Sequence, residues 1–184
     1  MKIVPFTDDL IFKVTEFTDT NIGKNYYTIN EMTENQKKSV TLNNEITSFV
    51  LMNDSNEILG LRLAFPPGNW AHGKGSKLRP ELWPFDLNSA GYFQSLFISP
   101  AAQGKGFGPA LSEKAIEIFK NCGARGIVTH CWKESPNNSS FKYLEKINFK
   151  TVIEHPNYWI DVDYICTRDG YPCKCTALEM ILVL

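Results

Sequence analysis

The sequence predicts an α/β (α+β) fold in which helices flank a mixed central sheet. The main observation is the stretch 95–123, which has the pattern of a strand, a glycine-rich turn and an amphipathic helix. A second observation is the pair of apolar segments 47–52 and 58–65, which the turn-forming residues 53–56 join into a hairpin. Together they predict antiparallel strands at the start of the sheet, followed by strand–helix units.

Length and composition fit one domain covering residues 1–184. A chain of 184 residues can bury about 70% of its unfolded surface. The formal net charge of −1 gives no field that favours nucleic acid or an anionic membrane. No apolar signal segment starts the chain, and no stretch approaches the ~20 apolar residues of a membrane span. The five cysteines are an odd number at scattered positions, which predicts reduced thiols and a cytoplasmic protein.

The first forty residues have a weak pattern. Residues 10–17 alternate weakly between apolar and polar side chains, so we expect the first strand there. Thr18, Asp19 and Thr20 offer an N-cap, and a helix is expected from them to about Ser39.

An irregular insertion loop is expected at residues 66–91, before a strand that opens at Tyr92. The loop is rich in Gly and Pro, yet it carries Trp70, Trp83 and Phe85. Long irregular loops inside compact domains are often functional. These aromatic side chains therefore either line a binding pocket or partner surface, or fold back and shield the sheet edge.

The glycine-rich turn at 103–108 contains three glycines in six positions, so its backbone can adopt positive φ. Pro109 is tolerated in the first turn of the following helix, and Gly123 is placed to end it. Such a turn presents free N–H groups and the positive end of the helix dipole, which suits a phosphate or pyrophosphate. The alternative is a tight turn that needs glycine only for its geometry. The apolar face of the helix comprises Phe107, Ala110, Leu111, Ala115, Ile118, Phe119 and Cys122.

The C-terminal third continues the alternation of strands and helices. A buried strand is predicted at 126–132, and the capping residues 135–140 introduce a short helix that ends at Asn148. Strands follow at 149–154 and 177–184, separated by a loop at 156–176. The predicted order is β-α-(α)-β-β-β-α-β-α-β-β.

Two motifs carry a resemblance to a known family. The pattern Q-x-x-G-x-G at Gln103, Gly106 and Gly108 follows F-I-S-P and resembles motif A of the GNAT superfamily of acyl-CoA-dependent N-acetyltransferases. A second GNAT signature, N-x-x-A-x-x-L-Y-x-K-x-G-F, is similar to the stretch from Asn137 to Phe149. The resemblance implies a mixed sheet whose fourth and fifth strands splay apart, with about six to seven strands in all.

The resemblance also implies a site for acetyl-CoA. In this family the loop amides hold the pyrophosphate, and the N–H of Phe97 or Ile98 meets the developing oxyanion. Asn137 matches an asparagine that contacts the cofactor, and Ser140 matches a small residue against the pantetheine. The implied cofactor-binding residues are Phe97, Ile98, Gln103, Gly104, Lys105, Gly106, Phe107, Gly108, Asn137 and Ser140.

Three positions depart from the family pattern. The tyrosine that often protonates the leaving thiolate falls on Leu144, and Tyr143 lies about 100° round the helix from it. Pro109 lacks an N–H that the family often directs at the pyrophosphate, so that contact is lost or supplied by Ala110 or Lys105. The fourth-strand positions that often carry a glutamate base are Tyr92 and Gln94.

The acid and the base are therefore only candidates. Tyr143 is the candidate acid, and His130 is the first candidate base because its unperturbed pKa suits proton transfer near pH 7. A solitary strand histidine is more often structural, and solvent can also take the proton. The remaining base candidates are His72, Glu81 and Asp86. Cys131 could be a nucleophile, but small buried cysteines are common in protein cores.

The last three cysteines raise the question of a metal. Cys166, Cys173 and Cys175, with His155 upstream, could be zinc ligands. The spacing C-x6-C-x-C is not a standard zinc pattern and a fourth ligand is not evident, so we expect free thiols and no metal. Tyr158 and Trp159 in the same region are expected to add to the acceptor wall.

We expect an N-acetyltransferase that transfers an acetyl group from acetyl-CoA to a primary amine by direct attack in a ternary complex. The acceptor is a small-molecule or peptide amine; neither nucleic acid nor membrane is expected as a partner, and the protein is a monomer or homodimer. One alternative is a catalytically inactive GNAT-fold module that binds or senses acyl-CoA. Another is an unrelated nucleotide-binding protein that uses the same loop for a different phosphate.

Overall fold

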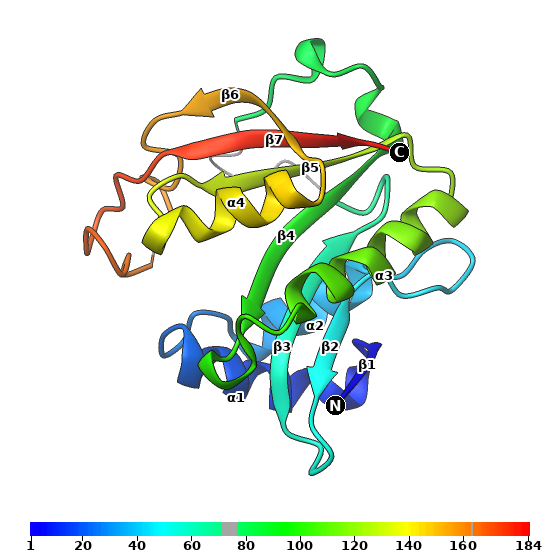
Figure 1. The fold of residues 1–184 in the computed structure, drawn as a ribbon, viewed down its shortest axis with the longest axis vertical. Helices are drawn as coiled ribbons and strands as arrows, with labels where there is room; N and C mark the ends of the chain where they lie inside the picture. The colour runs from blue at the N-terminus through cyan, green and yellow to red at the C-terminus, as the bar shows by residue number, and fades with distance from the viewer. Residues whose placement is uncertain (71–76, 163) are drawn as a thin grey trace.

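The computed structural model describes residues 1–70, 77–162 and 164–184 (Figure 1). Its centre is one seven-stranded sheet with the order β1-β2-β3-β4-β5-β7-β6. Every neighbouring pair is antiparallel except β4 and β5, which are parallel, so the sheet is mixed as predicted. The strands are β1 (Lys2–Pro5), β2 (Phe49–Met52), β3 (Ile58–Phe65), β4 (Ala90–Ile98), β5 (Gly126–Trp132), β6 (Lys150–His155) and β7 (Ala177–Val183).

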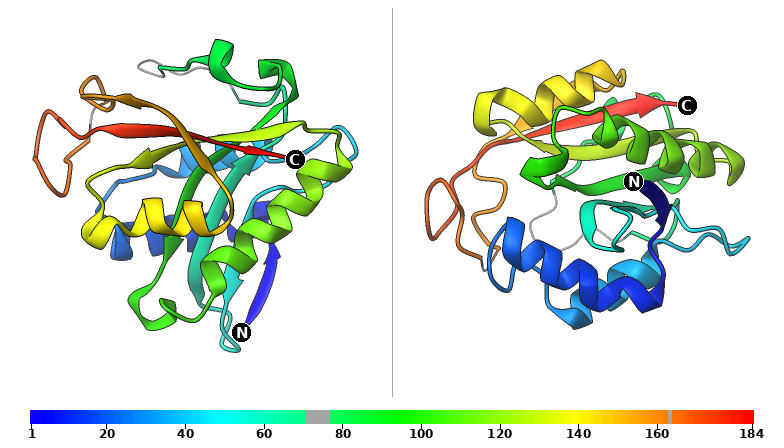
Figure 2. Two further views of the ribbon diagram at one scale, coloured as in Figure 1. Left: turned by 45° about the horizontal axis from the view of Figure 1, so that its top comes forward. Right: turned by 60° about the horizontal axis from the view of Figure 1, so that its bottom comes forward.

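Helices cover both faces of the sheet (Figures 1 and 2). They are α1 (Ile11–Asn21), α2 (Ile29–Lys38), α3 (Phe107–Asn121) and α4 (Ser139–Lys146). The helices α3 and α4 pack on one face, where Leu111, Phe119 and Leu144 join Phe93 of β4 in a buried core. The helices α1 and α2 pack on the opposite face of β2 and β3 through a separate core. Among the described helices, none is long and apolar enough to cross a membrane.

The strand expected at residues 10–17 is wrong, because Leu10 ends a short 3-10 turn and residues 11–17 belong to α1. The buried apolar residues Leu10, Val14 and Phe17 of this segment recur with helical spacing and face the sheet. The hydroxyl of Thr15 donates to the carbonyl of Ile11 one turn back, which accommodates this β-branched residue in the helix. The first strand lies earlier, at Lys2–Pro5, and pairs with β2.

The N-cap expected at residues 18–20 is also wrong, because these residues lie in the last turns of α1. The second helix starts later, and Thr28 caps it. The side chain of Thr28 accepts from the N–H of Glu31, and the Glu31 carboxylate accepts from the N–H of Thr28 at 2.8 Å. This capping box satisfies two amides that the start of a helix leaves free.

The aromatic loop at 66–91 folds back onto the sheet in its described part. Trp83 is buried against Val128 of β5 and Ile181 of β7. The ring of Phe85 lies so close to Gly126 that an added Cβ would come within 2.1 Å of it. Of the two alternatives for this loop, these contacts favour shielding of the sheet.

Candidate active site

The strands β4 and β5 separate halfway along their length. They pair only from Ala90 to Phe93 and from Gly126 to Thr129, although β4 continues to Ile98. The pairing of β4 with β3 shifts by one residue past Phe93, which leaves Gln94 as a bulge. The bulge bends β4 away from β5, as Figure 1 shows, and leaves one edge of β4 without a partner strand.

The register shows which backbone groups line this gap. Across the pair Gly60 and Ile98, the N–H of Ser99 donates to the carbonyl of Leu59 at 2.8 Å. In an antiparallel ladder this places the N–H and C=O of Ile98 on the side away from β3. The free amide that faces the gap is therefore that of Ile98, while the amide of Phe97 faces β3.

The glycine-rich turn lies beyond the end of β4 and leads directly into α3. Gly104 and Gly106 have φ of +73° and +80°, a region that favours glycine. Within the described chain, the five successive N–H groups from 104 to 108 have no hydrogen-bond acceptor. The N–H of Ala110 donates to the carbonyl of Gly106 at 3.2 Å, so the helix has already used it. The turn thus offers amides and a positive helix end to an anion.

Two side chains of the turn fold back rather than project outward. The amide of Gln103 donates to the carbonyl of Ile98 at 2.9 Å, and Lys105 Nζ donates to the carbonyl of Ala101 at 2.8 Å. Both bonds fix the turn against the end of β4. What the turn presents is its backbone, whereas these side chains support its shape.

Gly108 has a packing role in addition to its free amide. It is buried, and an added Cβ would lie 3.3 Å from the side chain of Leu96 and 3.8 Å from the ring of Tyr143. Its lack of a side chain lets α3 approach β4 and α4 closely. Phe107 packs, partly buried, against the same core.

The second signature spans α4 and the residues on either side of it. Asn137 is exposed and has a φ of +55°, which asparagine tolerates better than most residues. The N–H of Ser140 donates to the Ser135 hydroxyl at 3.1 Å, so Ser135 satisfies one of the free amides at the start of this helix. The contacts of Asn137 and Ser140 with a cofactor remain a prediction.

The hydroxyl of Tyr143 lies in a buried polar cluster between α3, α4 and β3. It accepts from Arg62 Nη2 at 2.8 Å and is hydrogen-bonded to the Ser112 hydroxyl. Arg62 is 3% exposed, and its guanidinium lies 4.2 Å from the centre of the Phe93 ring. Burial lowers the pKa of Arg62, and Tyr143 counteracts that effect. Leu144, at the family's tyrosine position, points into the apolar core instead.

His130 projects from the opposite face of the sheet, beneath the 66–91 loop. Its Nε2 lies 2.9 Å from the carbonyl of Lys77, and its Nδ1 lies 2.9 Å from the hydroxyl of Tyr92. A carbonyl can only accept, so Nε2 carries the proton and Nδ1 accepts from Tyr92. The ring also stacks on Tyr158 at 4.3 Å. Burial lowers the pKa of His130 to about 4 and raises that of Tyr92.

This low pKa predicts a pH-dependent stability. The unfolded chain takes up a proton at His130 below about pH 6.5, whereas the folded protein resists protonation until about pH 4. The stabilising contribution is therefore complete above pH 6.5 and is lost as the pH falls toward 4, by up to about 3 kcal/mol. We expect His130→Gln to reduce this slope in urea unfolding between pH 7 and pH 4.5. If the pH dependence of stability were the same in His130→Gln and in the wild type, the low pKa of His130 would not be its cause.

The carboxylate of Glu179 lies next to His130 and was not singled out by the sequence. It is fully buried, accepts from Trp83 Nε1 at 2.6 Å and lies 2.7 Å from His155 Nε2. The backbone N–H of Arg79 also points at it, at 3.2 Å. The carboxylate thereby connects β7, β6 and the 66–91 loop. Side chains alternate between the two faces of a strand, and this alternation along β7 places Glu179 on the face that the 66–91 loop covers. The alternation is the one sequence feature that could have pointed to Glu179.

The other base candidates lie outside this network. Glu81 is exposed and paired with Arg79, and Asp86 is exposed. His72 lies outside the described residues. Cys131 is 3% exposed, and burial raises the pKa of its thiol to about 12, which disfavours a nucleophilic role.

Similarity to known proteins agrees with this architecture. Residues 16–149, more than half of the chain, match the acetyltransferase (GNAT) family. The chain therefore belongs to the GNAT acetyltransferase family. None of the curated proteins matches the sequence significantly.

Several solved structures share the fold. An N-acetyltransferase from Staphylococcus aureus Mu50 is 21% identical, with a TM-score of 0.66 and coverage of 99% of this chain and 97% of that one. Ard1 from Thermoplasma volcanium is 12% identical, with a TM-score of 0.68 and coverage of 100% and 97%. The putative acetyltransferase yncA from Salmonella typhimurium, solved with acetyl-CoA, is 16% identical, with a TM-score of 0.67 and coverage of 100% and 94%.

Proposed function

We propose that this protein transfers an acetyl group from acetyl-CoA to a primary amine by direct attack of the amine in a ternary complex. The observation that carries the proposal is the gap between β4 and β5, which ends at a turn whose five backbone amides have no acceptor among the described residues. The gap suits an extended pantetheine chain, and the turn suits the pyrophosphate attached to it. Membership of the GNAT family and the acetyl-CoA bound to yncA support this choice of cosubstrate.

In the proposed reaction the amine nitrogen forms a bond to the thioester carbonyl carbon, and the carbon–sulfur bond breaks. The amide of Ile98, which faces the gap, donates to the carbonyl oxygen as negative charge develops on it. The amine loses one proton and the leaving thiolate gains one, so the transfer needs a proton acceptor and a proton donor. No covalent enzyme intermediate is required.

The two candidates for proton transfer lie on opposite faces of the sheet. Tyr143 lies on the face of α3 and α4, and we propose that its hydroxyl, held by Arg62 and Ser112, faces the leaving sulfur. His130 lies on the loop face, where Tyr92 covers its Nδ1. Burial lowers the pKa of His130 to about 4, so His130 is a weak base near pH 7. We therefore propose solvent as the main acceptor of the amine's proton, and His130, reached through the Tyr92 hydroxyl, as the competing one.

The proposal is tested first by calorimetric titration with acetyl-CoA and CoA, with ATP as the control. Binding of the two CoA species without ATP binding is expected. A screen of primary amines for acetyl-CoA-dependent thiol release should then identify turnover. CoA binding without turnover on any amine would favour the inactive module. A folded protein that binds neither CoA species would refute the proposal.

A further inference from the structure

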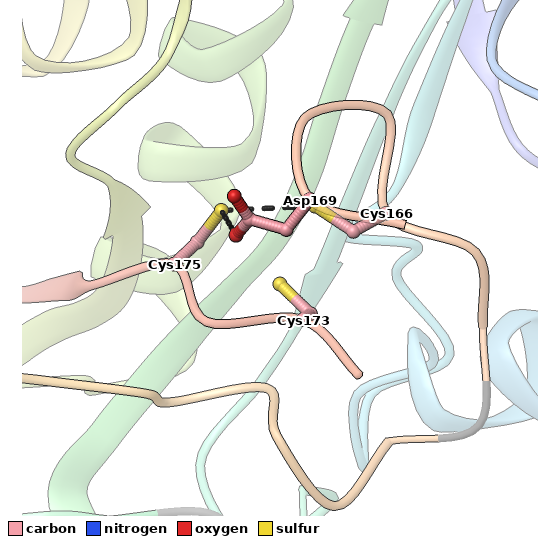
Figure 3. Close-up of side chains that lie close together, drawn as sticks. All are labelled: Cys166, Asp169, Cys173 and Cys175. Atoms are coloured by element: carbon pink, nitrogen blue, oxygen red, sulfur yellow. Dashed lines mark hydrogen bonds between the residues drawn. The ribbon is translucent and has the colours of Figure 1, made fainter. Parts of the chain in front are cut away.

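The loop between β6 and β7 gathers four potential metal ligands. The sulfurs of Cys166, Cys173 and Cys175 and a carboxylate oxygen of Asp169 all lie within 4.8 Å of one another (Figure 3). The three cysteines are 5%, 0% and 1% exposed. The three cysteines alone supply three ligands, and Asp169 supplies the fourth that the sequence pattern C-x6-C-x-C lacks.

We propose that these four side chains bind a single Zn²⁺ ion in a closed structural site. Thiolates and a carboxylate are ligands that Zn²⁺ accepts, and structural zinc sites are usually tetrahedral with four protein ligands. Soft sulfur ligands also disfavour Mg²⁺ and Ca²⁺, which prefer oxygen. With four protein ligands, no position is left open for a catalytic water.

Two distances between ligand atoms match the edges of a tetrahedral zinc site. Two sulfurs that are each about 2.3 Å from one tetrahedral Zn²⁺ lie about 3.8 Å apart. The Cys166 and Cys175 sulfurs are 3.7 Å apart. The Cys175 sulfur lies 3.3 Å from Asp169 Oδ2, near the roughly 3.5 Å expected for a sulfur–oxygen edge. A disulfide would need about 2.0 Å between sulfurs.

The backbone arranges the ligands in two short pieces. Cys166 and Gly170 exchange two backbone hydrogen bonds of 2.9 Å, and Gly170 has a φ of +75°. The resulting tight turn carries Cys166 and Asp169 with two residues between them, a separation common between zinc ligands. Cys173 and Cys175 are buried on either side of exposed Lys174, so alternation directs both sulfurs inward.

Hydrogen-bond donors surround the sulfurs as they would surround thiolates. The backbone N–H groups of Arg168 and Asp169 are directed at the Cys166 sulfur. The hydroxyl of Tyr164 donates to the Cys173 sulfur at 3.1 Å. Such contacts orient metal ligands and stabilise their charged form.

Two features distinguish the cluster from ordinary apolar packing of thiols. The indole N–H of Trp132, which packs on these cysteines, is buried and lacks a hydrogen-bond partner in the described chain. A thiolate in the cluster would give this N–H an acceptor. The guanidinium of Arg168 lies 3.6 Å from Asp169 and offsets the negative charge of the ligand set.

The site would fix the loop against the open end of the β4–β5 gap. The ring of Tyr164 lies 6.3 Å from that of Tyr26, which in turn lies 5.6 Å from the ring of Phe97 near the end of β4. The ion would therefore hold one wall of this region without taking part in acetyl transfer. Metal binding does not depend on the proposed function.

The test measures metal in the whole protein purified under reducing conditions and supplied with Zn²⁺. We expect about one zinc per chain by elemental analysis after desalting, and a sulfur-to-metal absorption band when Co²⁺ replaces it. Cys173→Ser should lose the metal. Cys122→Ser is the matched control, because Cys122 lies outside the cluster, and it should retain the metal.

If Cys173→Ser fails to fold, Asp169→Asn provides the same test, because it changes the one exposed ligand and leaves the buried thiols in place. It should weaken Zn²⁺ binding at least about tenfold in a competition with a chromophoric chelator. Wild-type protein that retains no metal and shows no Co²⁺ band would overturn the proposal. Equal retention by Cys173→Ser, or a Cys166–Cys175 disulfide in place of two of the five thiols, would also overturn it.

Discussion

Replacing Gly106 by glutamate is expected to abolish binding of acetyl-CoA while the protein stays folded. Nothing lies within 4 Å of a Cβ added at Gly106, so the new side chain meets no protein atom at its base. It would place a carboxylate beside the backbone amides of 104–108 and repel the pyrophosphate that they are proposed to bind. We expect at least about a hundredfold loss of affinity, equivalent to about 3 kcal/mol, in a calorimetric titration.

The matched control is Gly123→Glu at the opposite end of α3. Gly123 has a φ of +81°, against +80° at Gly106, and also has open space around its Cβ. Both variants therefore carry the same side chain in the same strained backbone conformation, at about 1–2 kcal/mol of stability each. Only Gly106→Glu should lose coenzyme binding. Wild-type affinity in the folded Gly106→Glu protein would show that the anion site is placed wrongly.

The glycine-rich turn proposed to bind the pyrophosphate, and the helix after it, could be predicted because their determinants are local. Glycine, proline and the apolar period act within one or two turns of chain, and they indicated the turn at 103–108 and the helix after it. The structure places α3 at Phe107–Asn121, with positive φ at Gly106 and Gly123. Local chemistry was sufficient there.

The strand wrongly expected at residues 10–17 shows where local pattern fails, because tertiary packing decides the structure of this segment. Segment 10–17 contains β-branched and aromatic residues that favour a strand when considered alone. Packing on the sheet decides otherwise, since Leu10, Val14 and Phe17 bury a single helical face. The strand that completes this edge, Lys2–Pro5, has only four residues and little pattern of its own.

The side-chain clusters around Glu179 and Asp169 could not be predicted from the sequence, because their members come from segments far apart in the chain. Glu179 meets a tryptophan 96 positions earlier in the chain, and Asp169 is one of 20 acidic residues with nothing local to distinguish it. The direction of the free amide in β4 likewise depends on its register with β3. These features follow from the folded sheet.

The second large effect is expected at Glu179, whose carboxylate anchors the 66–91 loop to the sheet. Glu179→Ala would leave the buried groups of Trp83 and His155 and the N–H of Arg79 without their acceptor, and it would open a cavity on β7. Unpaired buried polar groups and a lost side chain together predict a loss of about 3–5 kcal/mol in the free energy of unfolding. For a chain of this length that corresponds to a fall in Tm of about 10 °C.

Glu154→Ala is the control, because Glu154 is a glutamate on the adjacent strand β6 whose side chain is 51% exposed and pairs with Lys133 at the surface. An exposed ion pair of this kind contributes about 1 kcal/mol or less. Glu179→Gln keeps the volume and one acceptor oxygen, so its cost should fall between the two. Urea unfolding measures all three, and proteolysis should cut the 66–91 loop faster in Glu179→Ala. Equal stability of Glu179→Ala and Glu154→Ala would mean that packing by Trp83 and Phe85 holds the loop without the carboxylate.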